Sequence, residues 1–204
     1  MVIFTPLDFP TLVPDDWDVF WDIWERKSGP LIKNLTNVDY SPVQVGSTGI
    51  WRGLDLWPSY YNPKQNPVWV APHYDASSQL PNFYKTINAF SEKFKLYRVR
   101  LIQSNLNIPA HTDNGADNWN IRAYMHYTSS KSQWYFTKPN DLERHHINMP
   151  DETMWFAYND GLSWHGSDYD PDHKKILIQL YFKGDVSDVI EHSIEKYKDY
   201  IIEF

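Results

Sequence analysis

Strand-like segments are concentrated in one block of this 204-residue chain, and this concentration most constrains its fold. Helical periodicity precedes the block and follows it. Runs rich in β-branched and aromatic residues predict five strands in the block, at 95–103, 120–128, 132–137, 153–158 and 174–182. This order of elements predicts an α+β fold, in which a jelly-roll barrel is backed by helices.

Three segments carry apolar residues at helical spacing. The segment 15–26 places four aromatic side chains on one face: Trp17, Phe20, Trp21 and Trp24. A second helix is expected to begin at Pro81, since proline suits the first turn. A third is expected over 186–204, with Asp185 or Ser187 as its cap.

The length and the order of elements predict one domain over 1–204. It would comprise a helical and irregular part packed on the barrel (1–95), a core β-helix with the polar motif described below (96–183) and a C-terminal helix (185–204). Short strands are also expected within 43–57. The aromatic-rich segment 51–74 reads as a long irregular connection that can cover a site.

Composition narrows the kinds of site and partner that are expected. The chain has no cysteine, so a metal site must use His, Asp or Glu. A formal net charge of −7 argues against a nucleic-acid partner, because phosphate contacts need a basic surface. No apolar run is long enough to suggest a membrane span, and the first residues lack the features of a secretory signal. A cytoplasmic location is therefore expected, while the oligomeric state stays open.

Two histidines and one aspartate form the most informative polar pattern. His111 and Asp113 are two residues apart, so on an extended segment both side chains point to the same side. His165 follows much later, in a polar connection before the predicted strand 174–182. Two imidazoles and one carboxylate can hold iron and leave positions open for co-substrate and oxygen. We therefore expect these three residues to bind one metal ion, with a surface turn as the alternative for the His-x-Asp pair alone.

Cationic side chains near this motif are candidates for binding an anionic co-substrate. Lys175 lies ten residues after His165, at the entrance to the predicted strand, where it can pair with a carboxylate. The alternative is that Lys175 is a solvated strand entrance. Arg98 and Arg100, on the strand leading to His111, can also bind a carboxylate.

The stretch from 98 to 182 resembles the aspartyl/asparaginyl β-hydroxylase-like branch of the Fe(II)/2-oxoglutarate-dependent oxygenases. The run 105–111 (NLNIPAH) looks like the family's approach to its proximal iron ligand, and 121–126 (IRAYMH) looks like its Arg-x-x-Met-His strand. The resemblance implies a double-stranded β-helix with iron held by a proximal and a distal histidine. It also implies that His126 contacts 2-oxoglutarate, that Lys175 replaces the family arginine for the distal carboxylate, and that Arg122 is a further candidate.

Two positions depart from the branch. Asp113 supplies a carboxylate that some members lack, which favours hydroxylation, because halogenating relatives leave that position vacant for halide. Tyr124 stands where the branch has an arginine directed at an acidic substrate, which argues against an Asp or Asn substrate.

These observations together predict a dioxygenase (hydroxylase) that uses Fe(II), 2-oxoglutarate and O2. The resemblance implies decarboxylation of 2-oxoglutarate to succinate, coupled to hydroxylation. The acidic net charge, Tyr124 and the aromatic segment 51–74 favour an amino-acid-like or peptidyl substrate. Trp57, Tyr60 and Tyr61 are candidate lid residues, unless they only attach the loop to the barrel. The alternative function is a cupin-like metal- or ligand-binding module for carbohydrate or peptide, without oxygenase turnover.

Overall fold

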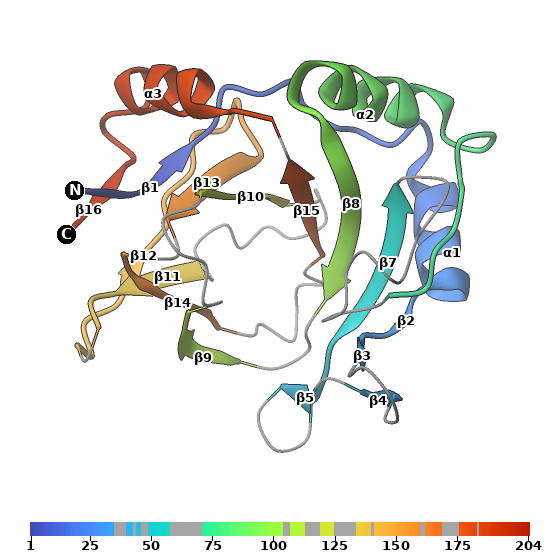
Figure 1. Cartoon of the computed structure of the whole chain (residues 1–204), viewed down its shortest axis with the longest axis horizontal. Helices are drawn as coiled ribbons and strands as arrows, with labels where there is room; N and C mark the ends of the chain where they lie inside the picture. Colours follow the sequence, from blue (N-terminus) through green and yellow to red (C-terminus); the bar gives the residue numbers. More distant parts are fainter. Residues whose placement is uncertain are drawn as a thin grey trace. The chain divides into compact units, whose positions relative to one another are not determined.

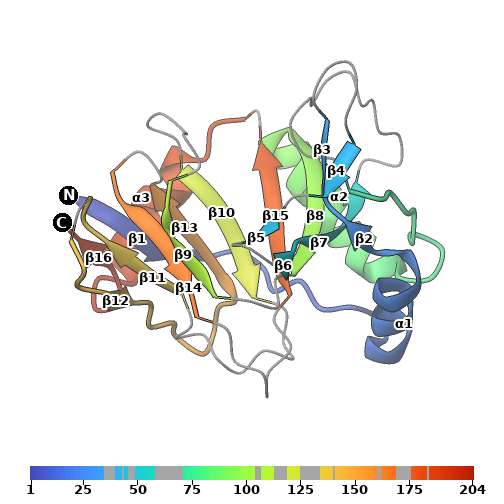
Figure 2. The same ribbon diagram turned by 90° about the horizontal axis from the view of Figure 1, so that it is seen from below.

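The computed structural model describes residues 1–34, 40–42, 44–45, 49–57, 71–103, 107–112, 119–124, 134–139, 141–159, 162–168, 176–182 and 184–204 (Figures 1 and 2). The chain divides into two compact units. The first comprises Met1–Thr11, Asn105–Leu177 and Asp185–Phe204. The second comprises Leu12–Ser104 and Ile178–Gly184, so the chain leaves the first unit and returns to it twice.

Two antiparallel sheets build the first unit. Four neighbouring strands of one sheet belong to this unit, in the order β16 (Ile202–Glu203), β1 (Val2–Pro6), β13 (Trp155–Asn159), β10 (Trp119–Tyr124). The other has the order β12 (His145–His146), β11 (Trp134–Thr137), β14 (Trp164–Ser167), β9 (Ile108–His111). From β9 to β14 the chain changes sheet at every connection except the β11–β12 hairpin. Such alternation places strands that are distant in sequence side by side, as for β9 and β14.

Aromatic side chains fill the space between these two sheets. Phe4 of β1 lies 5.7 Å, between ring centroids, from both Phe136 of β11 and Phe156 of β13. Trp134 of β11 lies 5.6 Å from both Phe156 and Tyr158. Large buried rings contribute much of the hydrophobic stabilisation of such a core. These five aromatic side chains thus have a structural use on the inner faces of this unit.

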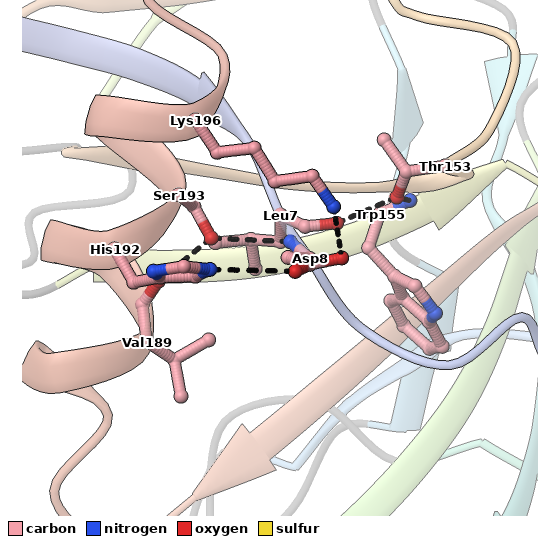
Figure 3. Close-up of polar contacts among 8 residues, drawn as sticks. All are labelled: Leu7, Asp8, Thr153, Trp155, Val189, His192, Ser193 and Lys196. Atoms are coloured by element: carbon pink, nitrogen blue, oxygen red, sulfur yellow. Dashed lines mark hydrogen bonds and ion pairs between the residues drawn. The ribbon is translucent and has the colours of Figure 1, made fainter.

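A polar clasp holds the segment after β1 against α3 (Ser187–Lys196) (Figure 3). The backbone N–H of Asp8 donates to the Ser193 hydroxyl over 3.1 Å. Its carboxylate accepts from Lys196 Nζ at 2.7 Å and lies 3.5 Å from His192 Nε2. The neighbouring Leu7 carbonyl accepts from the buried Thr153 hydroxyl at 2.6 Å. These contacts attach α3 to the segment that directly follows β1.

The second unit contains four neighbouring hydrogen-bonded strands in the order β15 (Leu177–Phe182), β8 (Leu96–Gln103), β7 (Arg52–Trp57), β2 (Gly29–Pro30). Two short hairpins accompany it, β3 (Ile32–Asn34) with β4 (Tyr40–Pro42) and β5 (Gln44–Val45) with β6 (Gly49–Ile50). Helix α1 (Trp17–Lys27) begins after Asp16, whose carboxylate accepts from the Asp18 and Val19 N–H groups. Helix α2 (Pro81–Phe94) packs beside β8 and buries one apolar face.

The α+β class is confirmed, with three helices and antiparallel sheets in the described residues. Among the described strands no closed barrel forms. The predicted start of the second helix at Pro81 is confirmed. None of the helices in the described part of the chain has the length and apolarity needed to cross a membrane.

Several predictions of local structure are wrong, among them the irregular connection predicted from residue 51, since Arg52–Trp57 form β7. The last helix was predicted over 186–204, but α3 ends at Lys196 and Ile202–Glu203 form β16 on the edge of β1. The edge of β1 offers backbone hydrogen bonds that a continued helix would leave unmade. His165, expected in a polar connection, lies within β14, whose residues are largely buried.

Candidate metal centre

His111 and His165 face each other across two neighbouring strands. They are directly opposed in the antiparallel pairing of β9 with β14. Their ring centroids lie 4.5 Å apart. Imidazole nitrogens lie about 2.1 Å from a bound first-row metal ion, so two rings that share an ion must be this close. The structure thus brings together two residues that are 54 positions apart in the sequence.

A hydrogen bond fixes the ring of His111. Its Nδ1 lies 2.8 Å from the Pro109 carbonyl oxygen. A carbonyl only accepts, so Nδ1 carries the proton and donates. In the neutral ring the Nε2 lone pair is then available for a metal ion, as in metal sites whose other ring nitrogen is held by a carbonyl.

Aromatic rings surround His165, which is only 3% exposed. Trp134 stacks on it with ring planes 4° apart and centroids 5.4 Å apart. The Tyr158 ring centroid lies 4.8 Å away. Such close packing by aromatic rings restricts the orientation of the imidazole ring.

The packing of β14 between β9 and β11 requires a glycine. A Cβ atom on Gly166 would lie 2.6 Å from the Ile108 carbonyl oxygen and would also clash with the Tyr135 ring. The pairing of β9 with β14 shifts register between His165 and Ser167, beside Pro109, which has no N–H to donate. This close approach and bulge set where His111 lies relative to His165.

The other predicted site residues are only partly placed. Asp113, His126 and Lys175 lie outside the described residues, as do Tyr60 and Tyr61. Arg122 lies on β10, with its backbone opposite Phe156 of β13, and its side chain is not described. Within the described segments no group of three His, Asp or Glu residues is close enough to hold a metal ion. The described residues therefore supply two of the three predicted ligands.

These two residues fit a metal ion by their chemistry. Imidazole suits iron, and two cross-strand imidazoles leave room for a third ligand and for exchangeable positions. Asp113, two residues after the end of His111's strand, is the carboxylate that the sequence offers for that place. The described geometry agrees with a two-histidine centre.

A second polar cluster lies in the other unit, on the sheet formed by β7, β8 and β15. Arg100 makes two hydrogen bonds to Asp55, at 2.6 and 3.0 Å. Arg98 Nε lies 3.9 Å from the same carboxylate, and its guanidinium lies 5.4 Å from the ring centroid of Tyr181. All three charged side chains are at least 95% buried. Arg100 already makes two hydrogen bonds to Asp55, which argues against Arg100 as the residue that binds 2-oxoglutarate.

The sequence analysis missed the strand positions of two polar residues, Asp55 and Ser167. Asp55 was assigned to an irregular connection, because nothing in the sequence links it with an arginine 45 residues later. Ser167 was assigned to a polar connection, although strand alternation places it on the same face as His165. Recognising 164–167 as a strand was the missing step.

Comparison with known proteins gives distant structural similarities only. No protein-family model and no curated protein matches the chain. A 2OG-Fe(II) oxygenase-family oxidoreductase from Burkholderia pseudomallei is similar at 9% identity, over 81% of this chain and 77% of that one, with a TM-score of 0.45. A prolyl hydroxylase from Trichoplax adhaerens, solved with a hypoxia inducible factor peptide, has 10% identity over 81% and 73%, with a TM-score of 0.38. An Fe(II)/α-ketoglutarate-dependent dioxygenase has 11% identity over 80% and 68%, with a TM-score of 0.36.

At such identities and TM-scores, similarity assigns this chain neither to a family nor to an activity. The functional argument therefore depends on the residues of the site.

Proposed function

We propose that this protein is an Fe(II)- and 2-oxoglutarate-dependent dioxygenase that hydroxylates an amino-acid-like or peptidyl substrate. The observation that carries the proposal is the direct opposition of His111 and His165 on β9 and β14. Two imidazoles on one inner face, with Asp113 close in sequence to the first, match the ligand set of this class of iron enzyme.

In this proposal His111, Asp113 and His165 hold the metal ion. Bound Fe(II) supplies oxygen activation coupled to decarboxylation of 2-oxoglutarate. The protein's part is to fix the ligands. The hydrogen bond from His111 Nδ1 to Pro109 directs the Nε2 lone pair, and the Trp134 ring holds the plane of His165.

The aromatic surroundings of His165 have a second consequence. Trp134, Tyr158 and Phe136 all lie with ring centroids within 6.5 Å of His165. Apolar walls exclude water on that side, which protects a reactive centre from side reactions and strengthens electrostatic contacts within it. This supports chemistry at the histidine pair.

Lys175 and His126 are proposed to bind 2-oxoglutarate, as the family resemblance implies, with Arg122 as a further candidate. Lys175 would pair with the distal carboxylate, and His126 would lie near the end that chelates iron. We further propose that the strands complete a jelly roll of the aspartyl/asparaginyl β-hydroxylase-like type. The alternation of β9 to β14 between two sheets supports this topology.

The proposed substrate follows from Tyr124 and from the aromatic segment 51–74. A tyrosine in place of a cationic side chain suits a substrate group held by ring contact better than a second carboxylate. Trp57, Tyr60 and Tyr61 are the proposed lid residues. The acidic net charge makes a nucleic-acid substrate the least suitable class.

Succinate formation tests the proposed function. Purified protein with Fe(II), 2-oxoglutarate and air is assayed alone and with free amino acids, peptides or single-stranded oligonucleotides. We expect succinate release that amino acids or peptides stimulate and that iron removal abolishes. Stimulation by oligonucleotides alone would contradict the proposed substrate class. No release under any condition, with iron still bound, would instead support a cupin-like binding module.

A further inference from the structure

Ser167 lies on the same strand as His165 and on the same face. The two residues are two positions apart on β14, and their partners on β11 are Trp134 and Phe136, the inward-facing rings of that strand. On the other side, Ser167 is opposite Ile108 of β9, the strand that carries His111. A hydroxyl therefore stands beside the histidine pair on an otherwise largely apolar surface.

This hydroxyl is buried and lacks a hydrogen-bond partner in the described part of the chain. Ser167 is 1% exposed, and its Oγ makes no hydrogen bond there. Burying a hydroxyl without a partner is unfavourable, and an alanine at this position would avoid that cost. An acceptor atom of a ligand bound at the histidine pair would supply the missing partner.

From these facts we infer that Ser167 donates a hydrogen bond to a carboxylate oxygen of 2-oxoglutarate, an inference that rests on the proposed function. Residues two apart on a strand are separated by about 6.7 Å, which is comparable to the span of a five-carbon dicarboxylate. A ligand held at His165 can therefore reach Ser167. Carboxylate oxygens only accept hydrogen bonds, so a hydroxyl donor is the complementary group.

Thr137 provides a matched control on the same sheet. Its hydroxyl is also buried, at 3% exposure, and also lacks a hydrogen-bond partner among the described residues. It lies on β11 one residue after Phe136, so its side chain is on the face away from the histidine pair. Removing this hydroxyl changes a buried polar group without changing the face that carries His165.

The experiment compares the parent, Ser167→Ala and Thr137→Val. Mn(II) replaces Fe(II) under oxygen-free conditions, and calorimetry measures the dissociation constants of Mn(II) and then of 2-oxoglutarate. We expect the parent to bind both. Ser167→Ala should keep the parent's Mn(II) constant and raise the 2-oxoglutarate constant about tenfold, the effect typical of one hydrogen bond to a charged group. Thr137→Val should leave both constants unchanged.

Each other outcome overturns the inference, and the outcomes differ in what else they contradict. If the parent binds both and Ser167→Ala binds 2-oxoglutarate within twofold of it, Ser167 has no such role and the proposed function stands. If Ser167→Ala also loses Mn(II), or Thr137→Val weakens 2-oxoglutarate equally, the effect is one of packing. If the parent binds no Mn(II) or no 2-oxoglutarate, the proposed function fails as well.

Discussion

Asp55 is the shared carboxylate partner of two buried guanidinium groups. It accepts two hydrogen bonds from Arg100 and lies within 3.9 Å of Arg98. In water these groups would be solvated separately. In the interior the Asp55 carboxylate offsets the repulsion between the two guanidinium charges. Removing this carboxylate should therefore lower the free energy of unfolding far more than removing one partner of a surface ion pair.

We therefore expect Asp55→Ala to lower the free energy of unfolding by about 3 to 5 kcal/mol. Urea denaturation measures this change when the free energy of unfolding falls with urea concentration at the same slope in the parent and the variant. Asp22→Ala is the control, because Asp22 pairs with Arg26 on the exposed surface of α1 and should cost less than about 1 kcal/mol. Equal changes in the two variants would contradict the assignment of Asp55 as a buried charge partner.

The residues of the site differ in how far the sequence could predict them. His111 and His165 were chosen because their types and spacing match a ligand set, and the structure places them opposite each other. Asp55, Arg98 and Arg100 carry no such local pattern. Their burial follows from the pairing of β7 with β8, a long-range contact that hydrophobic periodicity does not encode.

At the scale of elements, the close packing of β14 against β9 positions the histidines. We expect Gly166→Ala to push β9 away, since the new Cβ would meet the Ile108 carbonyl at 2.6 Å. The free energy of unfolding should fall by about 1 to 3 kcal/mol, and the metal dissociation constant should rise because His111 moves with β9. Denaturation and metal calorimetry measure both quantities.

Gly29→Ala on β2 is the control for that variant. Its added Cβ would lie 2.9 Å from the Pro72 ring, a crowded position in the other unit. It should lower stability without altering metal binding. If Gly166→Ala binds metal as tightly as the parent, the spacing of β9 and β14 does not control the site.

The clasp between Asp8 and α3 predicts a dependence of stability on pH. The hydrogen bond from Lys196 is the main cause that lowers the pKa of the Asp8 carboxyl below its usual 3.8, although partial burial opposes this. A lowered pKa stabilises the folded state above the unfolded-state value, and this contribution is lost as pH falls through the folded-state value. Because the carboxylate is 40% exposed, the effect should be modest.

Melting temperatures of the parent and Asp8→Asn, measured from pH 7 to pH 2, test this expectation. The parent should be the more stable protein at neutral pH. The difference should begin to shrink near pH 3.8, the unfolded-state value, and should disappear once the pH lies below the lowered folded-state pKa. Asp199→Asn, an exposed position just beyond α3, should give a small difference that does not change with pH. A difference for Asp8→Asn that stayed constant down to pH 2 would contradict the role of its charge.

Elements were easier to predict where one local signal dominated. Pro81 and the spacing of apolar residues indicated α2, and alternating or continuous apolar runs indicated β8, β11, β13 and β15. The end of α3 could not be read in this way. Residues 197–204 carry helical periodicity, but the free edge of β1 decides that Ile202–Glu203 form a strand.

At the scale of the whole molecule, metal binding should be linked to folding. His111 and His165 come together only when β9 and β14 pair, so an ion that they hold stabilises the folded chain. At a hundredfold excess of metal over its dissociation constant the gain is about 2.7 kcal/mol, which corresponds to a rise of about 5 to 10 °C in melting temperature for a chain of this size. Thermal unfolding with Mn(II), and again with a chelator, measures this; a shift of the same size in His165→Ala would contradict the link.

Anaerobic calorimetry with Fe(II) tests the central claim most directly. The parent should bind one Fe(II) per chain, His111→Ala and His165→Ala should each bind it at least tenfold more weakly, and His146→Ala should bind it as the parent does. His146 is the matched control, because it is exposed and pairs with Tyr135, on the face of the same sheet away from the pair. Metal ligands act as a set, so loss of either one should suffice. If His165→Ala binds iron as tightly as the parent, the pair is not a metal centre and the proposed function is wrong.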